Sequence, residues 1–308
     1  MRKFHRQLVW KPGRRRRLLL EPPVSGTPKP YWHEGTSYTW VKVDLSGGSD
    51  VLHVYFGAVG GADESDGGEV FEFFEDFDYS SVSELTSVWG TYNSPTVTLS
   101  NSIVTVDKGH IYRYVGANLI LNNVVEVRWR RRSGYSGHMA NIGFTFNSGG
   151  WIDDSDNYCV SRYNTYNGGK LLFGGNVGAV SDPSTGVWTI VQIYHDSGTS
   201  RAYEPRGTLR AQRSWSPPSS AHYILLGGET YSGGNGVADY DWILIRKKPF
   251  QQPSVTYNAT EIGEWIIDGV LYTKRRKITV SSSSSVSGYQ LQIDYSKWNE
   301  SAIRVFQL

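Results

Sequence analysis

Aromatic residues beside amide, imidazole and hydroxyl groups are the feature of this sequence most suggestive of chemistry. Several of them stand in Gly- and Asn-rich stretches, which are typical of loops. Sugar binding needs a flat aromatic face for the pyranose ring and planar polar groups for its hydroxyls. The candidate carbohydrate-binding residues are Tyr135, His138, Trp151, Tyr163, Asn164, Tyr166 and Trp215. Each one alone is more often a core or rim residue, so the set indicates a ligand surface without locating it.

Other kinds of chemistry find little support in the residues. The single cysteine, Cys159, permits neither an internal disulfide nor a cysteine-based metal site. The 7 histidines show no HxH or HExxH spacing, and the sequence has no Gly-x-Ser-x-Gly nucleophile elbow. No run of ~18 apolar residues predicts a membrane span. The apolar stretch Leu18–Leu20 is too short for a signal sequence, so we expect no obvious secretion signal.

Positive charge gathers at the N-terminus, although the whole chain is nearly neutral. Lys and Arg number 31 against 29 Asp and Glu, a net charge of +2, whereas Arg14–Arg17 form an unbroken basic run. One interpretation is an arm that neutralises phosphates. The other is a solvated or partner-docking tail, which we favour because aromatic residues do not interleave with the charges at regular spacing. We therefore expect no nucleic-acid partner.

From Tyr31 onward the hydrophobic pattern is that of β-strands. In Val124–Arg130 the apolar side chains of Val125, Val127 and Trp129 alternate with Glu126 and Arg128, the period of a half-buried strand. Runs of this kind recur along the chain with Gly-, Asn- and Ser-rich turns between them. A 3.6-residue period is not evident, and only Ser80–Thr86 suggests a short helical turn. The length of 308 residues suggests about two domains at ~150 residues each, although one large β-domain would also fit.

The central block resembles the concanavalin A-like lectin and glucanase group, which includes laminin-G-like modules. Its opening, FEFFEDFDYSSVSELTSVWG over residues 71–90, has that group's acidic-aromatic strand, short turn and tryptophan. Its close, ADYDWILIRKK over residues 238–248, looks like the group's last strand. The resemblance implies a two-sheet jelly roll and a sugar-related activity.

The resemblance also implies a calcium site. Jelly rolls of this group often carry a structural calcium ion that bridges the first and last strands. Asp76, or Glu75, and Asp241 occupy the matching places. Calcium prefers carboxylate and carbonyl oxygens, which acids beside turns provide. The alternative is a pair of acids on exposed strand ends.

The resemblance raises the question of catalysis too. Laminarinase-type members hydrolyse β-glucans with carboxylates in an E-x-D-x-x-E pattern, and Glu64, Asp66 and Glu69 match it. A retaining pair must stand ~5–5.5 Å apart on one face of a strand. This stretch is a Gly-rich turn before the first strand of the block, and glycines disfavour a strand interior. We therefore interpret the match as a solvated acidic loop and expect no catalytic residue.

The two flanks resemble a second, functionally uncharacterised β-domain typical of archaeal and bacterial surface proteins. Its second half matches the N-terminal flank, in PYWHE (30–34), TWVKVDL (39–45) and VLHVYFG (51–57). The strands that normally open it stand instead at the other end of the chain, in YTKRRKITV (272–280) and GYQLQIDYSKW (288–298).

Three arrangements follow from this split. The C-terminal strands complete the N-terminal sheet of the same chain, complete that of a neighbouring copy, or form a third small domain. An incomplete sheet has an unpaired edge, which favours completion. We expect residues 1–68 to hold the basic arm and half of the small domain, 69–248 the jelly roll, and 249–308 the completing strands. The fold class is then all-β: a concanavalin-like jelly roll plus a smaller β-sandwich assembled from both chain ends.

The sequence as a whole predicts a non-catalytic structural or adhesive protein with a lectin-like jelly roll, located on a virion or an extracellular surface. Its expected partners are a carbohydrate or glycoprotein surface and either further copies of itself or other structural subunits, and the cofactor that the resemblance implies is a structural calcium ion. The alternative is a polysaccharide-active glycoside hydrolase of the laminarinase type.

Overall fold

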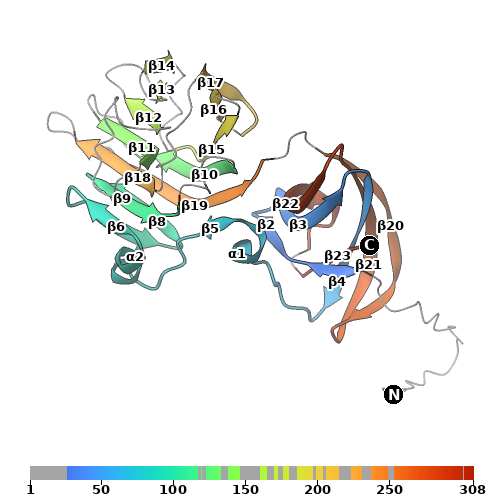
Figure 1. Ribbon diagram of the computed structural model, residues 1–308. Helices are drawn as coiled ribbons and strands as arrows, with labels where there is room; N and C mark the ends of the chain where they lie inside the picture. Colours follow the sequence, from blue (N-terminus) through green and yellow to red (C-terminus); the bar gives the residue numbers. More distant parts are fainter. Residues whose placement is uncertain are drawn as a thin grey trace, which may run out of the picture.

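The computed structural model describes most of the chain as antiparallel β-sheet, which confirms the all-β fold class. Two β-sandwiches of unequal size lie side by side (Figure 1). The described residues are 26–116, 119, 123–132, 138–145, 160–164, 170–172, 176–179, 186–196, 199–203, 206–214, 223–230, 237–248, 253–300 and 302–308.

The larger sandwich is the jelly roll, and its first sheet has eight strands. Their order is β17-β16-β15-β10-β19-β8-β7, with β5 also paired to β19. The strands are β17 (Leu209–Ser214), β16 (Thr199–Tyr203), β15 (Thr189–Asp196), β10 (Asn123–Arg131), β19 (Val237–Lys247), β8 (Ile103–Asp107), β7 (Thr96–Ser100) and β5 (Phe73–Glu75). As the alternation predicted, Val125, Val127 and Trp129 of β10 face the core.

The second sheet of the jelly roll has seven strands in the order β14-β13-β12-β11-β18-β9-β6. They are β14 (Asn176–Ala179), β13 (Lys170–Leu172), β12 (Val160–Asn164), β11 (His138–Thr145), β18 (Tyr223–Thr230), β9 (His110–Tyr114) and β6 (Gly90–Tyr92). Ile111, Ile224 and Leu226 from this sheet meet the first sheet in one buried cluster. The two sheets therefore share a single hydrophobic core.

The smaller sandwich is built from both ends of the described chain. Its five-stranded sheet has the order β1-β23-β4-β21-β20 and its three-stranded sheet the order β2-β3-β22. The strands are β1 (Thr27–Lys29), β23 (Arg304–Gln307), β4 (Ser49–Val59), β21 (Val270–Ser281), β20 (Ser254–Ile267), β2 (Tyr31–Glu34), β3 (Tyr38–Ser46) and β22 (Ser285–Asp294). The C-terminal strands thus complete the N-terminal half within the same chain.

The jelly roll is inserted into the smaller sandwich between β4 and β20 (Figure 1). Its first and last strands pair with each other, with Glu75 opposite Ile243 and Phe73 opposite Ile245. The N–H of Glu72 continues the pairing by donating to the Ile245 carbonyl at 3.0 Å. Both connections to the smaller sandwich consequently leave the jelly roll at one place, as an inserted domain requires.

Two short helices flank the first jelly-roll strand. The helix α2 (Val82–Val88) lies where a helical turn was predicted, and Ser81 caps it by accepting from the Glu84 N–H. The helix α1 (Gly67–Val70) was not predicted; Asp66 caps it by accepting from the N–H groups of Gly68 and Glu69. Buried Leu85 anchors α2 to the jelly-roll core.

The smaller sandwich depends on its last strand, because Val305 of β23 lies in the core formed with β4 and β21. Replacing Val305 by Asp places an unpaired charge there, and we expect a loss of about 3 kcal/mol or more in the free energy of unfolding. The matched control is Leu308→Asp at the half-exposed terminal residue, where little loss is expected. Urea unfolding followed by tryptophan fluorescence measures both, and equal losses would contradict the placement of β23.

Candidate functional site

Glu75, a predicted calcium ligand, is buried and surrounded by hydrogen-bond donors. One carboxylate oxygen accepts from the Phe77 N–H at 3.0 Å. The other accepts from the Tyr79 hydroxyl at 2.8 Å, the Trp89 indole at 3.0 Å and the guanidinium of Arg113. Glu75 therefore anchors the first jelly-roll strand to α2 and β9 through these bonds.

The other two predicted calcium ligands have different surroundings. Asp241 of β19 forms an ion pair with Arg128 of β10. Asp76 accepts from the N–H of Asp78 at 3.3 Å, and burial raises the pKa of its carboxyl. Within the described ranges, no group of three or more His, Cys, Asp or Glu residues could hold a metal ion. The calcium site stays a prediction, and the carboxylates of Glu75 and Asp241 have cationic partners of their own.

The E-x-D-x-x-E stretch has structural roles in the described part of the chain. Asp66 caps α1, and Glu69 lies in the first turn of that helix. Glu64 forms an ion pair with Arg304 of β23. The stretch therefore joins α1 to the C-terminal strand and does not lie on a β-strand.

Of the predicted sugar-binding residues, Tyr135, Trp151, Tyr166 and Trp215 lie outside the described residues. The backbone brings the other three to one end of the seven-stranded sheet. Met139 of β11 stands opposite Asn164 of β12, and Ala140 opposite Tyr163. His138 precedes Met139 at the same end of β11.

A second set of aromatic residues, which the sequence analysis missed, lies on the same sheet. The ring centroids of Tyr112 and Tyr114 of β9 lie 5.9 and 5.3 Å from that of Tyr223 of β18, each pair edge to face. Leu225 packs with Tyr112 and Tyr223, apart from the core between the sheets. We call Tyr112, Tyr114, Tyr223 and Leu225 the tyrosine face. The alternation Tyr-x-Tyr at residues 112–114 was the available signal for it.

The tyrosine face is partly exposed and locally built for its rings. The side chain of Tyr114 is 63% exposed. Gly90 of β6 stands opposite Tyr112, and a Cβ atom there would lie 2.2 Å from the Tyr112 ring. Any larger residue at position 90 would therefore have to displace the Tyr112 ring. His110, earlier on β9, is buried without a hydrogen-bond partner among the described residues, and burial lowers its pKa to about 4. The histidine is therefore neutral at pH 7.

A buried group of charges lies where the two sandwiches meet. Glu126 of β10 accepts from Arg246 of β19 at 2.5 Å and from Arg206 at 2.7 Å. Arg206 also donates to Glu34 of the smaller sandwich at 2.8 Å, and Glu34 accepts from the Trp40 indole at 2.8 Å. These two carboxylates and two guanidiniums, which we call the junction network, balance in charge and join both sandwiches.

Electrostatics keeps Glu126 ionised inside the protein. Burial raises the pKa of its carboxyl, but the charges of Arg206 and Arg246 outweigh that effect and lower it to about 2. Gln192 completes its shell by donating at 3.0 Å. The aromatic rings of Trp40 and Trp242 lie close to the Arg206 guanidinium, with centroids at 5.5 and 5.8 Å.

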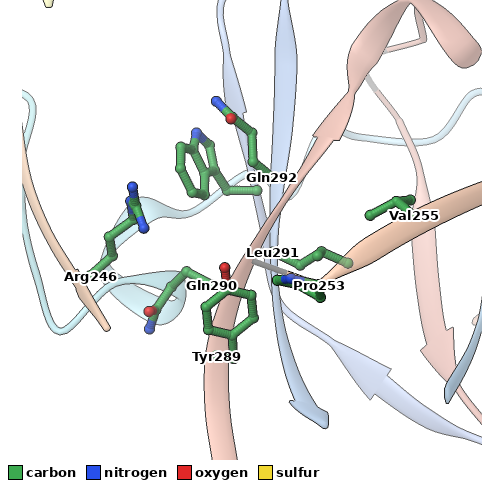
Figure 2. A pocket seen from close by; sticks show the side chains of 8 residues that line it. Arg246, Pro253, Val255, Tyr289, Gln290, Leu291 and Gln292 are labelled. Atoms are coloured by element: carbon green, nitrogen blue, oxygen red, sulfur yellow. The ribbon is translucent and has the colours of Figure 1, made fainter. Parts of the chain in front are cut away.

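A small pocket opens beside the junction network. Figure 2 shows Arg246 on one side and Val255 on the other, with the Tyr289 hydroxyl between them. Its volume is about 110 Å³, below the ~300–1,000 Å³ typical of small-molecule sites. Trp40, Pro253, Gln290, Leu291 and Gln292 complete its lining. We therefore assign the pocket to the packing of the two sandwiches.

One family is recognisable over part of the chain. The family described as Domain of unknown function (DUF2341) matches residues 27–92. This segment contains β1–β4 of the smaller sandwich and the opening of the jelly roll. The comparison with curated proteins finds no match.

Several solved structures are similar to part of this chain at low identity. A glycosyl hydrolase family protein from Mycobacterium fortuitum is 12% identical with a TM-score of 0.40, covering 57% of this chain and 99% of its own. The VIP36 exoplasmic/lumenal domain in its Ca2+/Man-bound form is 10% identical, with a TM-score of 0.42 and coverage of 59% and 92%. The Bacillus licheniformis β-glucanase is 13% identical, with a TM-score of 0.36 and coverage of 57% and 98%. Function at these identities must come from this chain's own residues.

Across the described residues, no helix is long and apolar enough to cross a lipid bilayer. The helices α1 and α2 have 4 and 7 residues. A spanning helix needs ~20.

The junction network generates a stability prediction. Replacing Arg206 by Met leaves two buried carboxylates facing one guanidinium, so we expect a loss of about 3–5 kcal/mol in the free energy of unfolding at pH 7. The matched control is Lys297→Met, which removes an exposed ion pair with Asp294 and costs about 1 kcal/mol or less.

The stability that Arg206→Met removes depends on pH. The pKa of Glu126 is lowered from 4.5 to about 2, so its ionic contribution is present above about pH 4.5 and is lost as the pH falls toward 2. The difference between wild type and Arg206→Met must shrink over that range in denaturant titrations. A difference that stays constant with pH would contradict the role given to Glu126.

Proposed function

We propose that this chain binds carbohydrate, without cleaving it, through the outward face of the seven-stranded sheet. The observation that supports this is the tyrosine face, in which Tyr112, Tyr114 and Tyr223 cluster outside the core with Tyr114 largely exposed. Aromatic rings of this kind offer both an apolar face and a hydroxyl to a sugar. Asn164 lies on the same face of this sheet by register, because it stands opposite Met139, which stands opposite Glu229. His138 and Tyr163 stand at the alternate positions, on the face of Ile224 and Leu226.

The state of the buried acids favours binding over hydrolysis. Glycoside hydrolysis needs two carboxylates ~5–9.5 Å apart, one of which donates a proton. In the part of the chain that the structure describes, the buried carboxylates are Glu34, Glu75, Glu126 and Asp239, and each is held by at least one arginine. The pKa of Glu126 is lowered to about 2, so this carboxylate cannot act as a general acid at pH 7. Burial raises the pKa of Glu34, whose carboxylate is bound by Arg206 and by the Trp40 indole.

We place this activity in a structural, adhesive role at a virion or cell surface, where the chain associates with further copies or with other structural subunits. A glycoprotein or polysaccharide surface is the partner that the tyrosine face fits. The alternative function, a polysaccharide-active hydrolase of the laminarinase type, requires an acid pair that the described strands do not offer.

The tyrosine face is tested by alanine substitution. A glycan array first identifies the tightest-binding glycan, and calorimetric titration with that glycan then compares variants. Tyr114→Ala and Tyr223→Ala each remove a ring, and we expect affinity to fall about tenfold or more, or about 1.4 kcal/mol. The control is Tyr38→Ala, an exposed tyrosine of the smaller sandwich, which must bind as wild type does. An array without any response would contradict the proposal.

Hydrolysis is tested separately, because an enzyme of this fold would also bind sugars. We expect no new reducing ends when the protein is incubated with β-glucans and with the glycan found on the array. Reducing ends that appear with wild type and persist in Glu64→Gln, Asp66→Asn and Glu69→Gln would favour the hydrolase with an acid pair elsewhere. Their loss in those variants would restore the E-x-D-x-x-E stretch as the site.

A further inference from the structure

The strand β20 forms one edge of the five-stranded sheet in the smaller sandwich. It has 14 residues, and β21 is its only neighbour in the described sheet. The opposite edge is β1, with 3 residues. A long free edge presents backbone N–H and C=O groups that another strand can pair with.

Large apolar side chains stand exposed on and beside this edge. Ile262 and Ile266 of β20 are 78% and 74% exposed. Ile266 lies opposite Leu271 of β21, which lies opposite Val59 of β4, itself 67% exposed. Directly opposite residues point to the same face of a sheet, so Val59, Leu271 and Ile266 form one apolar row that ends at the free edge.

The neighbouring residues show that this row is outside the local core. Trp265 and Ile267 flank Ile266 in the sequence and are buried with Tyr55, Tyr272 and Phe306. Alternation therefore turns Ile266 away from that cluster. Burying Ile262 and Ile266 against another surface would remove exposed apolar area of β20 from water, which is favourable.

The sequence of β20 has few of the devices that protect a free edge. Proteins commonly place lysine or proline on such strands, whereas Ser254–Ile267 contains no lysine, arginine or proline. Its charges are Glu261, which is paired with Arg275, and Glu264. Two β-bulges twist the strand, between Tyr257 and Thr260 and between Ile262 and Trp265.

We propose that β20 pairs antiparallel with β20 of a second copy, about a two-fold axis at Ile262. In this register Ile262 meets itself and Glu261 lies opposite Gly263, so no like charges face each other at the axis. A shift that centres the axis on Glu264 sets two glutamates opposite each other, which is unfavourable. The self-complementary register favours a second copy over an unrelated partner.

This dimer makes one continuous sheet from the two smaller sandwiches, through an isologous contact that closes. It deepens the proposed association between copies and rests on that part of the proposed function. The tyrosine face belongs to the jelly roll, on the other sandwich. Sugar binding and dimer formation can therefore fail independently.

The test is the mass of the full chain in solution, measured by sedimentation across a wide dilution series. We expect a species of twice 34.5 kDa that dissociates on dilution. In the double variant Ile262→Lys/Ile266→Lys the dissociation constant must rise at least tenfold, while glycan binding per chain is unchanged. The control is Val187→Lys/Leu209→Lys, which charges two exposed apolar residues of the jelly roll and must leave the dimer intact.

Cross-linking tests the register directly. In a Cys159→Ser background, Ile262→Cys is expected to form an intermolecular disulfide under mild oxidation, and Val187→Cys at an exposed site elsewhere is not. A chain that stays monomeric at every concentration overturns the proposal, as does a dimer that the lysine variant leaves unchanged. A dimer that cross-links equally through both cysteines also overturns it.

Discussion

The pairing of the first and last jelly-roll strands is the constraint on which the rest of this structure depends. Glu75 lies opposite Ile243, and the short β5 is held in place by the four donors around the Glu75 carboxylate. Because these strands are neighbours, the chain leaves the jelly roll beside the point where it enters. β4 and the C-terminal strands can then meet, and β23 and β21 pair on either side of β4.

The contact between the two sandwiches lies close to this strand pair, and the junction network occupies it. The junction network of Glu34, Arg206, Glu126 and Arg246 fills the contact with balanced charge, and the pocket beside it is small. Two faces of the described residues lie apart from the junction. One is the tyrosine face of the jelly roll, and the other is the β20 edge of the smaller sandwich. The proposed sugar surface and the proposed self-association surface lie on different sandwiches, which is compatible with the adhesive role proposed above.

Local pattern was enough for part of this architecture. Alternation along β10 predicted which side chains enter the core, and the family resemblance carried by the end motifs of the central block implied a two-sheet sandwich. The junction network was not predictable, because Arg206 lies 172 residues from Glu34 and 80 from Glu126 along the chain. The partners of Glu75 and Asp241 were hidden for the same reason, since charge pairing across strands depends on register. Tyr112 and Tyr114 lie on the strand β9, whereas the predicted sugar-binding aromatics were chosen from loop-like stretches, so both tyrosines were missed.

The central claim is that the last strand belongs to the sheet of its own chain. Hydrogen–deuterium exchange measures it most directly, through the amides of residues 304–307 compared with those of β4. Because β23 lies between β1 and β4, its amides are expected to be protected from exchange as well as those of Val51–Tyr55. This protection is expected to be the same at every protein concentration. Exchange of β23 at the rate of an unstructured segment, or protection that disappears on dilution, would contradict it.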